Sequence, residues 1–403
     1  MLTSLSFIFL LGLAMAAVCQ RLKLPRIIGM LLTGILLGPY ALNLLDPSIL
    51  AVSADLRQMA LIIILLKAGL SLNLADLKRV GRPAVMMACV PASFEILGFL
   101  IFAPHILGVT RVEAAVMGAV LSAVSPAVVI PRMVQLMEER YGTDKSIPQM
   151  IMAGASCDDI FVIVLFSTFV TMAQGGAVHG TDLLNVPVSI ILGVALGVGT
   201  GYALSLFFEK AYVCGRYVRN STKVIILLGV SFLLMAVETW LKEIVSISGL
   251  LAVVSTACVL KIRSIPDVSS RLSEKFGKLR IAAEVILFVL VGAAGDIRYT
   301  LEAGLPALAM IAAALVFRSL GTMFCLFGTA LNLKERLFCI IAYLPKATVQ
   351  AAIGSVPLAL GLPCGALVLS VAVLAIVITA PLGALGMDLT YKKFLKKNGS
   401  IPA

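Results

Sequence analysis

The stretch "AVLSAVSPAVVI", residues 119–130, places a proline in the middle of a long apolar run. A second stretch of this kind, "IIAYLPKATVQA", occupies residues 340–351. Proline has no backbone N–H, and its ring clashes with the preceding helical turn, so it frees backbone groups inside a helix. The two stretches therefore predict two helices that are interrupted near their middles, at Pro126 and Pro345.

The composition around these stretches is that of a membrane protein. The 403 residues are 60% hydrophobic and only 13% charged, and the mean hydropathy is +1.07. Apolar runs longer than about 18 residues recur along the whole chain, which indicates a polytopic membrane protein. The first run is followed by "QRLKLPR" rather than by a small-residue cleavage site, so we expect it to be a retained helix. The eight cysteines are scattered without a CxxC pair, so they predict no disulfide framework and no metal centre.

The apolar runs predict an all-α protein with 13 transmembrane helices. Loop signals such as "DLKRVGRP", "YGTDKS" and "QGGAVHGTD" separate the runs. The predicted spans are 3–19, 27–43, 56–72, 83–105, 111–138, 147–173, 184–209, 222–241, 244–261, 278–296, 303–328, 335–361 and 364–387.

The positive charges give this topology a direction. Of the 32 lysines and arginines, 24 lie in or at the edges of the loops after odd-numbered spans and in the tail, and four lie in the other loops. Cytoplasmic loops carry the excess of Lys and Arg, so we expect the amino terminus outside and the carboxyl terminus in the cytoplasm. The net charge of +11 is explained in the same way and does not predict a nucleic-acid partner.

The span count divides into six, one and six. The first six spans cover residues 1–173, a linker span lies in 174–221, the second six cover 222–387, and 388–403 form a cytoplasmic tail. Spans 1 and 8 run in opposite directions, so the halves are inverted repeats. The two proline-interrupted spans, the fifth and the twelfth, occupy corresponding positions. Paired discontinuous helices in inverted halves indicate a substrate site near the middle of the bilayer.

A pair of acidic residues lies at the predicted depth of this site. In "GASCDDIFVIV", residues 154–164, Asp158 comes 11 residues after the start of its span, which is about 17 Å along a helix. Charges at this depth are costly and usually mark an ion or proton pathway. Adjacent buried carboxylates resist being ionised together, so the site would take either protons or a cation. We expect Asp158, Asp159 and the nearby Ser125 to bind Na⁺ or Li⁺, with freed backbone carbonyls completing the site.

Three of the other charges inside predicted spans bear on this site. Glu95 and Arg318 lie in the fourth and eleventh spans, which are partners in the inverted repeat, and a buried salt bridge between them would satisfy both. Lys346 follows Pro345 at the second helix interruption. We expect it to neutralise the negative ends of the half-helices and to lie near the aspartates.

Three motifs carry a resemblance to a known family. "AVSPAVVIPRM", "GASCDDI" and "LPKATVQAAIG" resemble the monovalent cation:proton antiporters, and within them the subfamily B sodium/hydrogen exchangers and their bacterial relatives. The likeness covers essentially the whole chain. It implies a secondary active transporter rather than an enzyme, which exchanges Na⁺ or Li⁺ for protons, needs no cofactor, and lies in the cell (inner) membrane of a bacterium.

The resemblance also implies a mechanism. Spans 4–6 and 11–13 would form a core domain that moves like an elevator against a scaffold of spans 1–3 and 8–10, and the scaffold would form a homodimer within the membrane lipid. Asp159 would be the main ion-binding carboxylate, and Asp158 its titrating partner. Several relatives have a lysine where this chain has Arg318. Because an arginine does not release its proton at physiological pH, the stoichiometry of exchange stays open.

Other functions fit the sequence less well. An intramembrane aspartyl protease needs its two aspartates on different helices and a GxGD motif, whereas this chain has "GAAGD" at 292–296. A sodium-coupled organic-solute symporter of the same fold would lack the paired aspartates. A cation channel would need a filter loop, and no stretch of this sequence resembles one. A potassium/proton antiporter stays open, because the residues do not separate Na⁺ from K⁺.

Overall fold

The computed structural model describes residues 1–22, 24–71, 81–174, 182–213, 218–241, 247–295 and 304–397. Within these residues the secondary structure is helical, which confirms the all-α prediction. The one β contact found there is an isolated antiparallel bridge between Tyr141 and Lys397.

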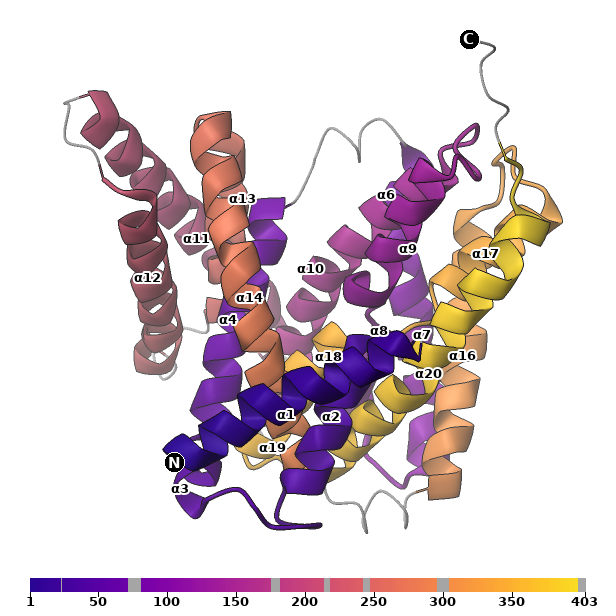
Figure 1. Cartoon of the computed structure of the whole chain (residues 1–403), viewed down its shortest axis with the longest axis horizontal. Coiled ribbons are helices and arrows are strands. Elements are labelled where there is room, and N and C mark those ends of the chain that lie inside the picture. The colour runs from indigo at the N-terminus through magenta and orange to yellow at the C-terminus, as the bar shows by residue number, and fades with distance from the viewer. Residues whose placement is uncertain are drawn as a thin grey trace. The chain divides into compact units, whose positions relative to one another are not determined.

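Figure 1 shows the helices, which lie at the predicted apolar runs. Every predicted span overlaps at least one of them. In chain order they are α1 (Leu2–Arg21), α2 (Arg26–Leu37), α3 (Pro47–Ala51), α4 (Ser53–Ser71), α6 (Arg82–Met87), α7 (Val90–Ile106), α8 (Arg111–Ser122), α9 (Pro126–Glu138), α10 (Ile147–Gln174), α11 (Asp182–Val213), α12 (Asn220–Leu241), α13 (Gly249–Arg263), α14 (Pro266–Ala294), α16 (Gly304–Cys325), α17 (Leu333–Ala342), α18 (Thr348–Gly354), α19 (Val356–Ala359) and α20 (Gly365–Phe394).

Not every predicted span is a single long helix. In the described part of the chain, eight helical segments are long and apolar enough to cross a membrane. The predicted span 83–105 is among these eight, although it is divided between α6 and α7, because Pro91 cannot continue the hydrogen bonding of the preceding helix. The count of 13 crossings and the inverted repeat therefore stay predictions.

The chain forms two compact units. Unit 1 comprises Met1–Ala51, Asn73–Val162 and Phe288–Ala403, and unit 2 comprises Val52–Leu72 and Ile163–Leu287. These units are defined by packing, whereas the predicted core and scaffold domains are defined by movement. The predicted division into core, scaffold and linker is therefore not tested by the structure.

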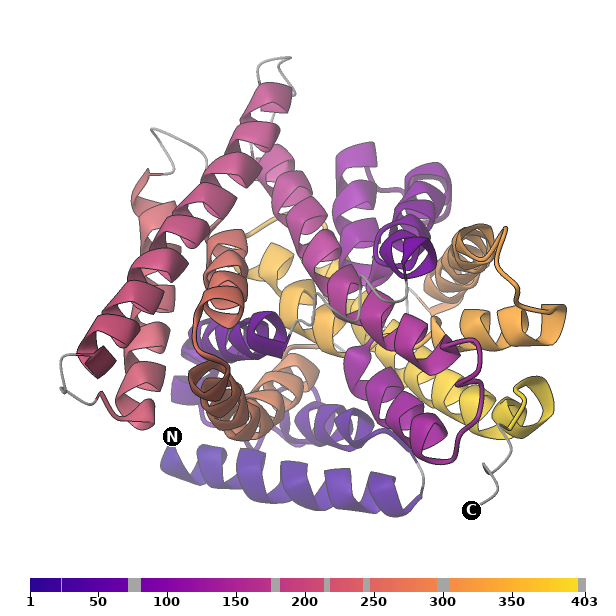
Figure 2. The ribbon, with the colours of Figure 1, turned by 90° about the horizontal axis from the view of Figure 1, so that it is seen from above.

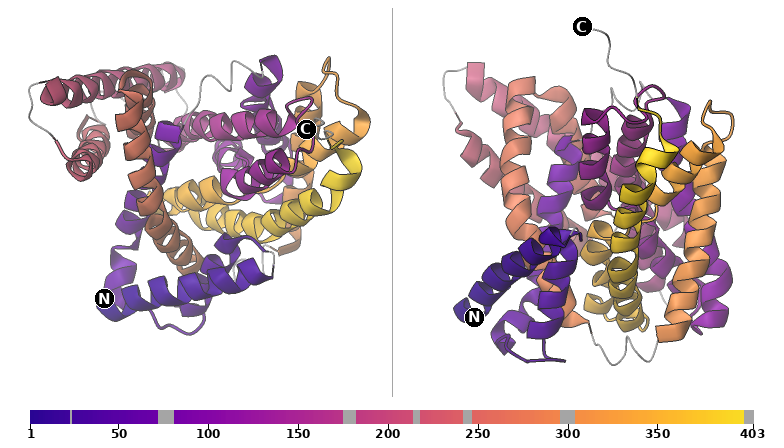
Figure 3. Two further views of the ribbon diagram at one scale, coloured as in Figure 1. Left: turned by 45° about the horizontal axis from the view of Figure 1, so that its top comes forward. Right: turned by 45° about the vertical axis from the view of Figure 1, so that its right-hand side comes forward.

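Glycines allow close helix packing in unit 1. α7 lies between α8 and α16. A Cβ on Gly118 of α8 would lie 3.0 Å from the Cβ of Phe99, and one on Gly321 of α16 would lie 2.9 Å from the Cβ of Phe94. Small residues let membrane helices approach closely. This packing brings together the two helices that carry Glu95 and Arg318. On another side of unit 1, α17 packs against α20 (Figure 3).

Glycines also allow close helix packing in unit 2. α11 lies along α13 (Figure 2), and Thr256 of α13 donates a hydrogen bond of 3.1 Å to the carbonyl of Gly197 in α11. α4 also packs on α13, where a Cβ on Gly69 would lie 2.6 Å from the Cβ of Ala257. Helix backbones in unit 2 are thus in contact at glycine positions, as in unit 1.

Candidate functional site

The first helix interruption lies between α8 and α9. α8 ends at Ser122, and α9 starts at Pro126, where the missing N–H costs nothing because it is the first helical position. The backbone N–H of Val124 donates to Asp158 Oδ2 at 2.7 Å. The carbonyl of Ala123 accepts from Gln350 Nε2 at 2.8 Å. Backbone groups freed by the break are thus satisfied by side chains from α10 and α18.

The second interruption lies between α17 and α18. α17 ends at Ala342 and α18 begins at Thr348, with Pro345 between them. The N–H of Lys346 donates to Thr379 Oγ1 at 2.9 Å, and the N–H of Ala347 donates to Gln350 Oε1 at 2.8 Å. The helix is therefore interrupted at both predicted prolines.

The two interruptions touch each other. The N–H of Ser125 donates to the carbonyl of Pro345 at 2.8 Å. Arg318 of α16 binds both breaks as well, since Nη1 donates to the carbonyl of Ser122 and Nε donates to the carbonyl of Tyr343. One guanidinium thereby holds together two segments that lie more than 200 residues apart in the sequence.

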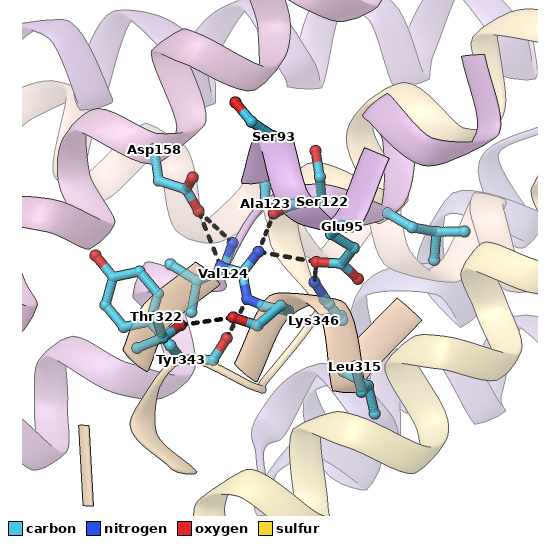
Figure 4. Close-up of polar contacts among 12 residues, drawn as sticks. Ser93, Glu95, Ser122, Ala123, Val124, Asp158, Leu315, Thr322, Tyr343 and Lys346 are labelled. Carbon is cyan, nitrogen blue, oxygen red and sulfur yellow. Dashed lines mark hydrogen bonds and ion pairs between the residues drawn. The ribbon is translucent and has the colours of Figure 1, made fainter. Parts of the chain in front are cut away.

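Four buried charges form a cluster at these breaks, which we call the central cluster: Glu95, Asp158, Arg318 and Lys346. Figure 4 labels Glu95, Asp158 and Lys346 of this cluster. Arg318 Nη1 lies 2.9 Å from Glu95 Oε2, and Arg318 Nη2 lies 3.2 Å from Asp158 Oδ2. Lys346 Nζ lies 2.5 Å from the same Glu95 oxygen. Two cations therefore face two carboxylates, which compensates charges that would be costly if buried singly.

The structure brings these predicted residues together, but the ion-pair partner of Lys346 differs from the expected one. Glu95 and Arg318 are in contact, as expected of a salt bridge. Lys346 pairs with Glu95, while it is Arg318 that contacts Asp158. The lysine expected beside the aspartates therefore lies on the Glu95 side of the cluster.

The candidate ion ligands have oxygens that remain unused. Asp158 is fully buried and Asp159, its neighbour in α10, is partly buried. In the described part of the chain, Asp158 Oδ1, Asp159 Oδ1 and Ser125 Oγ are all buried and have no hydrogen-bond partner. Buried polar atoms are normally satisfied, so each exception needs an explanation. A bound hard cation, or a proton on a carboxylate, would supply what these oxygens lack.

Sequence reasoning missed three residues that shape the site: Tyr343, Gln350 and Thr379. A signal existed for Gln350, because it is a polar residue in an apolar run and lies in the second quoted stretch. Thr379 gave none, because a threonine inside a helix can satisfy its hydroxyl at the carbonyl four residues earlier, as Thr379 does at Ala375.

Comparisons with known proteins agree with the family that the sequence motifs resemble. A family model described as "Sodium/hydrogen exchanger, transmembrane" matches residues 5–390. Sodium/hydrogen exchanger 9B2 of Pongo abelii is 34% identical over 93% of this chain and 70% of its own length. The human protein of the same name is 33% identical over the same shares. The solved structure of the sodium proton antiporter MjNhaP1 from Methanocaldococcus jannaschii superposes with a TM-score of 0.82 at 20% identity, covering 98% of each chain, and shows a shared fold.

Proposed function

The chain belongs to the sodium/hydrogen exchanger family, and from this premise we propose that it is a multi-pass membrane antiporter that exchanges Na⁺ or Li⁺ for protons. The observation that carries the proposal is the set of unpartnered oxygens of Asp158, Asp159 and Ser125, which lie beside a charge-compensated cluster at two broken helices. Cation and proton are its substrates, and no cofactor is required.

The two aspartates have different surroundings, which supports different roles. Asp158 Oδ2 is held by Val124 and Arg318, so this carboxylate is oriented and its charge is compensated. Asp159 Oδ1 is buried and has no hydrogen-bond partner among the described residues. We assign the main cation contact to Asp159 and the role of titrating partner to Asp158. Protons and cations exclude one another because both neutralise the same carboxylates.

The origin of the site residues supports an elevator movement. Glu95, Ser125, the aspartates, Arg318 and Lys346 all come from helices of the predicted core, that is from α7, α9 and its cap, α10, α16 and the α17–α18 break. A cluster bonded within one body would be carried across the membrane intact. The scaffold helices would form a homodimer. The amino terminus would lie outside the cell and the carboxyl terminus in the cytoplasm of a bacterium.

The test is transport by the purified full-length protein in liposomes that contain a pH-sensitive dye. An outward proton gradient should be dissipated when Na⁺ or Li⁺ is added. Flux with K⁺ alone would establish a potassium/proton antiporter instead. Co-transport of an organic solute with Na⁺, without proton movement, would contradict antiport and favour the symporter.

A further inference from the structure

Tyr343 has an unusual position at the central cluster. It is the C-cap residue of α17, directly after Ala342, and it is fully buried. Its carbonyl accepts a hydrogen bond from Arg318 Nε, and its ring lies under the Arg318 guanidinium, 5.4 Å from ring centre to Cζ. A cation over an aromatic face is stabilised by the ring's electrons. Backbone and ring of Tyr343 therefore both support Arg318, and its hydroxyl takes part in neither contact.

That hydroxyl is buried and has no hydrogen-bond partner among the described residues. It approaches the backbone of α10 at Gly154, where a Cβ would collide with the hydroxyl oxygen. A phenylalanine would complete the packing under Arg318 equally well and would bury no unused polar atom. The hydroxyl therefore calls for a partner that packing alone does not supply.

The position of Gly154 along α10 places the Tyr343 hydroxyl near Asp158. Gly154 and Asp158 are four residues apart, so they lie on the same face of the helix, about 6 Å apart along its axis. Figure 4 shows Tyr343 and Asp158 on the same side of the central cluster, opposite Glu95 and Lys346. The free hydroxyl thus lies about one helical turn from a carboxylate whose Oδ1 is also unpartnered.

We propose that the Tyr343 hydroxyl is a further oxygen of the cation site, which contacts the cation or a water of its hydration shell on the Gly154 side of Asp158. A hydroxyl suits this place because its lone pairs can face a cation, while its proton can be donated to the carboxylate when the cation has left. The inference rests on the proposed function, since it requires that Asp158 and Asp159 receive the cation.

The experiment removes the hydroxyl and keeps the ring. Full-length Tyr343→Phe is reconstituted in liposomes, and exchange is titrated with Na⁺ at fixed pH. The apparent Na⁺ constant should rise by about three- to tenfold, as expected for the loss of one oxygen contact, while the maximum rate and the melting temperature stay unchanged. Tyr391→Phe is the matched control, because it removes a tyrosine hydroxyl that bonds Glu139 at the end of α20, and its Na⁺ constant should equal that of the wild type.

Two outcomes would overturn the inference. One is an unchanged Na⁺ constant in Tyr343→Phe. The other is a melting temperature that falls as far in Tyr343→Phe as in Tyr343→Ala, because the hydroxyl would then serve only the packing that supports Arg318. Asp159→Asn measured in the same preparation separates this failure from a failure of the proposed function. If Asp159→Asn is inactive and Tyr343→Phe is normal, only the role of Tyr343 is wrong.

Discussion

The central cluster and the peripheral contacts between α9 and α20 use the same residue types in very different surroundings. At the periphery, Arg132 Nε lies 3.1 Å from Asp388 Oδ1, and the two side chains are 19% and 42% exposed. Nearby, Gln135 and Tyr391 donate hydrogen bonds to Glu139 and hold the pKa of this partly exposed carboxyl below its usual value. In the central cluster the four charged side chains are at most 2% exposed.

The comparison shows that the contribution of an ion pair to stability depends on how deeply the pair is buried. Exposed pairs contribute about 0.2–1 kcal/mol, because water and salt screen them. Breaking a buried pair by removing one partner costs about 3–5 kcal/mol, because the other charge is left uncompensated. A cation or proton that binds at the central cluster therefore alters the compensation of buried charges. One that binds at the periphery has little effect on stability, because water and salt screen the charges there.

The largest effect is expected from the aspartates. Asp159→Asn should abolish exchange, because an amide neither titrates nor binds Na⁺ strongly. Asp158→Asn should cripple exchange or change its charge stoichiometry, and it also removes one of the two anions that face Arg318. Both are measured as Na⁺-dependent proton flux in liposomes. Undiminished flux in purified Asp159→Asn would show that the site is assigned wrongly.

The next effect concerns the stability of the central cluster. Glu95→Gln and Arg318→Gln should each lower the free energy of unfolding by about 3–5 kcal/mol, because the first leaves Lys346 and the second leaves Asp158 buried without its ion-pair partner. The double variant should be destabilised by less than the sum of the two. Thermal unfolding in detergent of the four proteins measures this. Strict additivity would mean that the two side chains do not interact, contrary to their 2.9 Å separation.

A smaller effect is expected when the site is challenged with protons. We expect activity to fall at acid pH through competition at Asp158 and Asp159, so that the apparent Na⁺ constant rises by at most about tenfold per pH unit for one displaced proton. The maximum rate should recover at high Na⁺. Na⁺ titrations of exchange at several pH values test this. A constant Na⁺ affinity combined with a falling maximum rate would require a separate gate.

The smallest effect is expected at the periphery. Arg132→Gln or Asp388→Asn should change the free energy of unfolding by less than about 1 kcal/mol and should leave the Na⁺ constant unaltered, because both side chains retain contact with water. Thermal unfolding and Na⁺ titration of the two variants are compared with those of the wild type. A loss as large as that of Glu95→Gln would erase the distinction between the two regions.

Much of the fold followed from the sequence. The apolar runs determined where helices form, because a backbone in lipid must satisfy its own hydrogen bonds. Pro126 and Pro345 determined the two interruptions, because a proline lacks the donor that a helix interior needs. Asp158, Asp159 and Arg318 were recognisable as site candidates, because charges are rare at membrane depth.

Only the tertiary structure decided how these residues are connected. Which carboxylate Arg318 and Lys346 bind depends on the packing of α7, α10, α16 and the α17–α18 break, and no local pattern records distances between segments so far apart in sequence. The satisfaction of the broken backbone by Gln350 and Thr379 was invisible for the same reason. So was the free hydroxyl of Tyr343, because whether a polar atom is paired or unused depends on every neighbour that the fold brings to it.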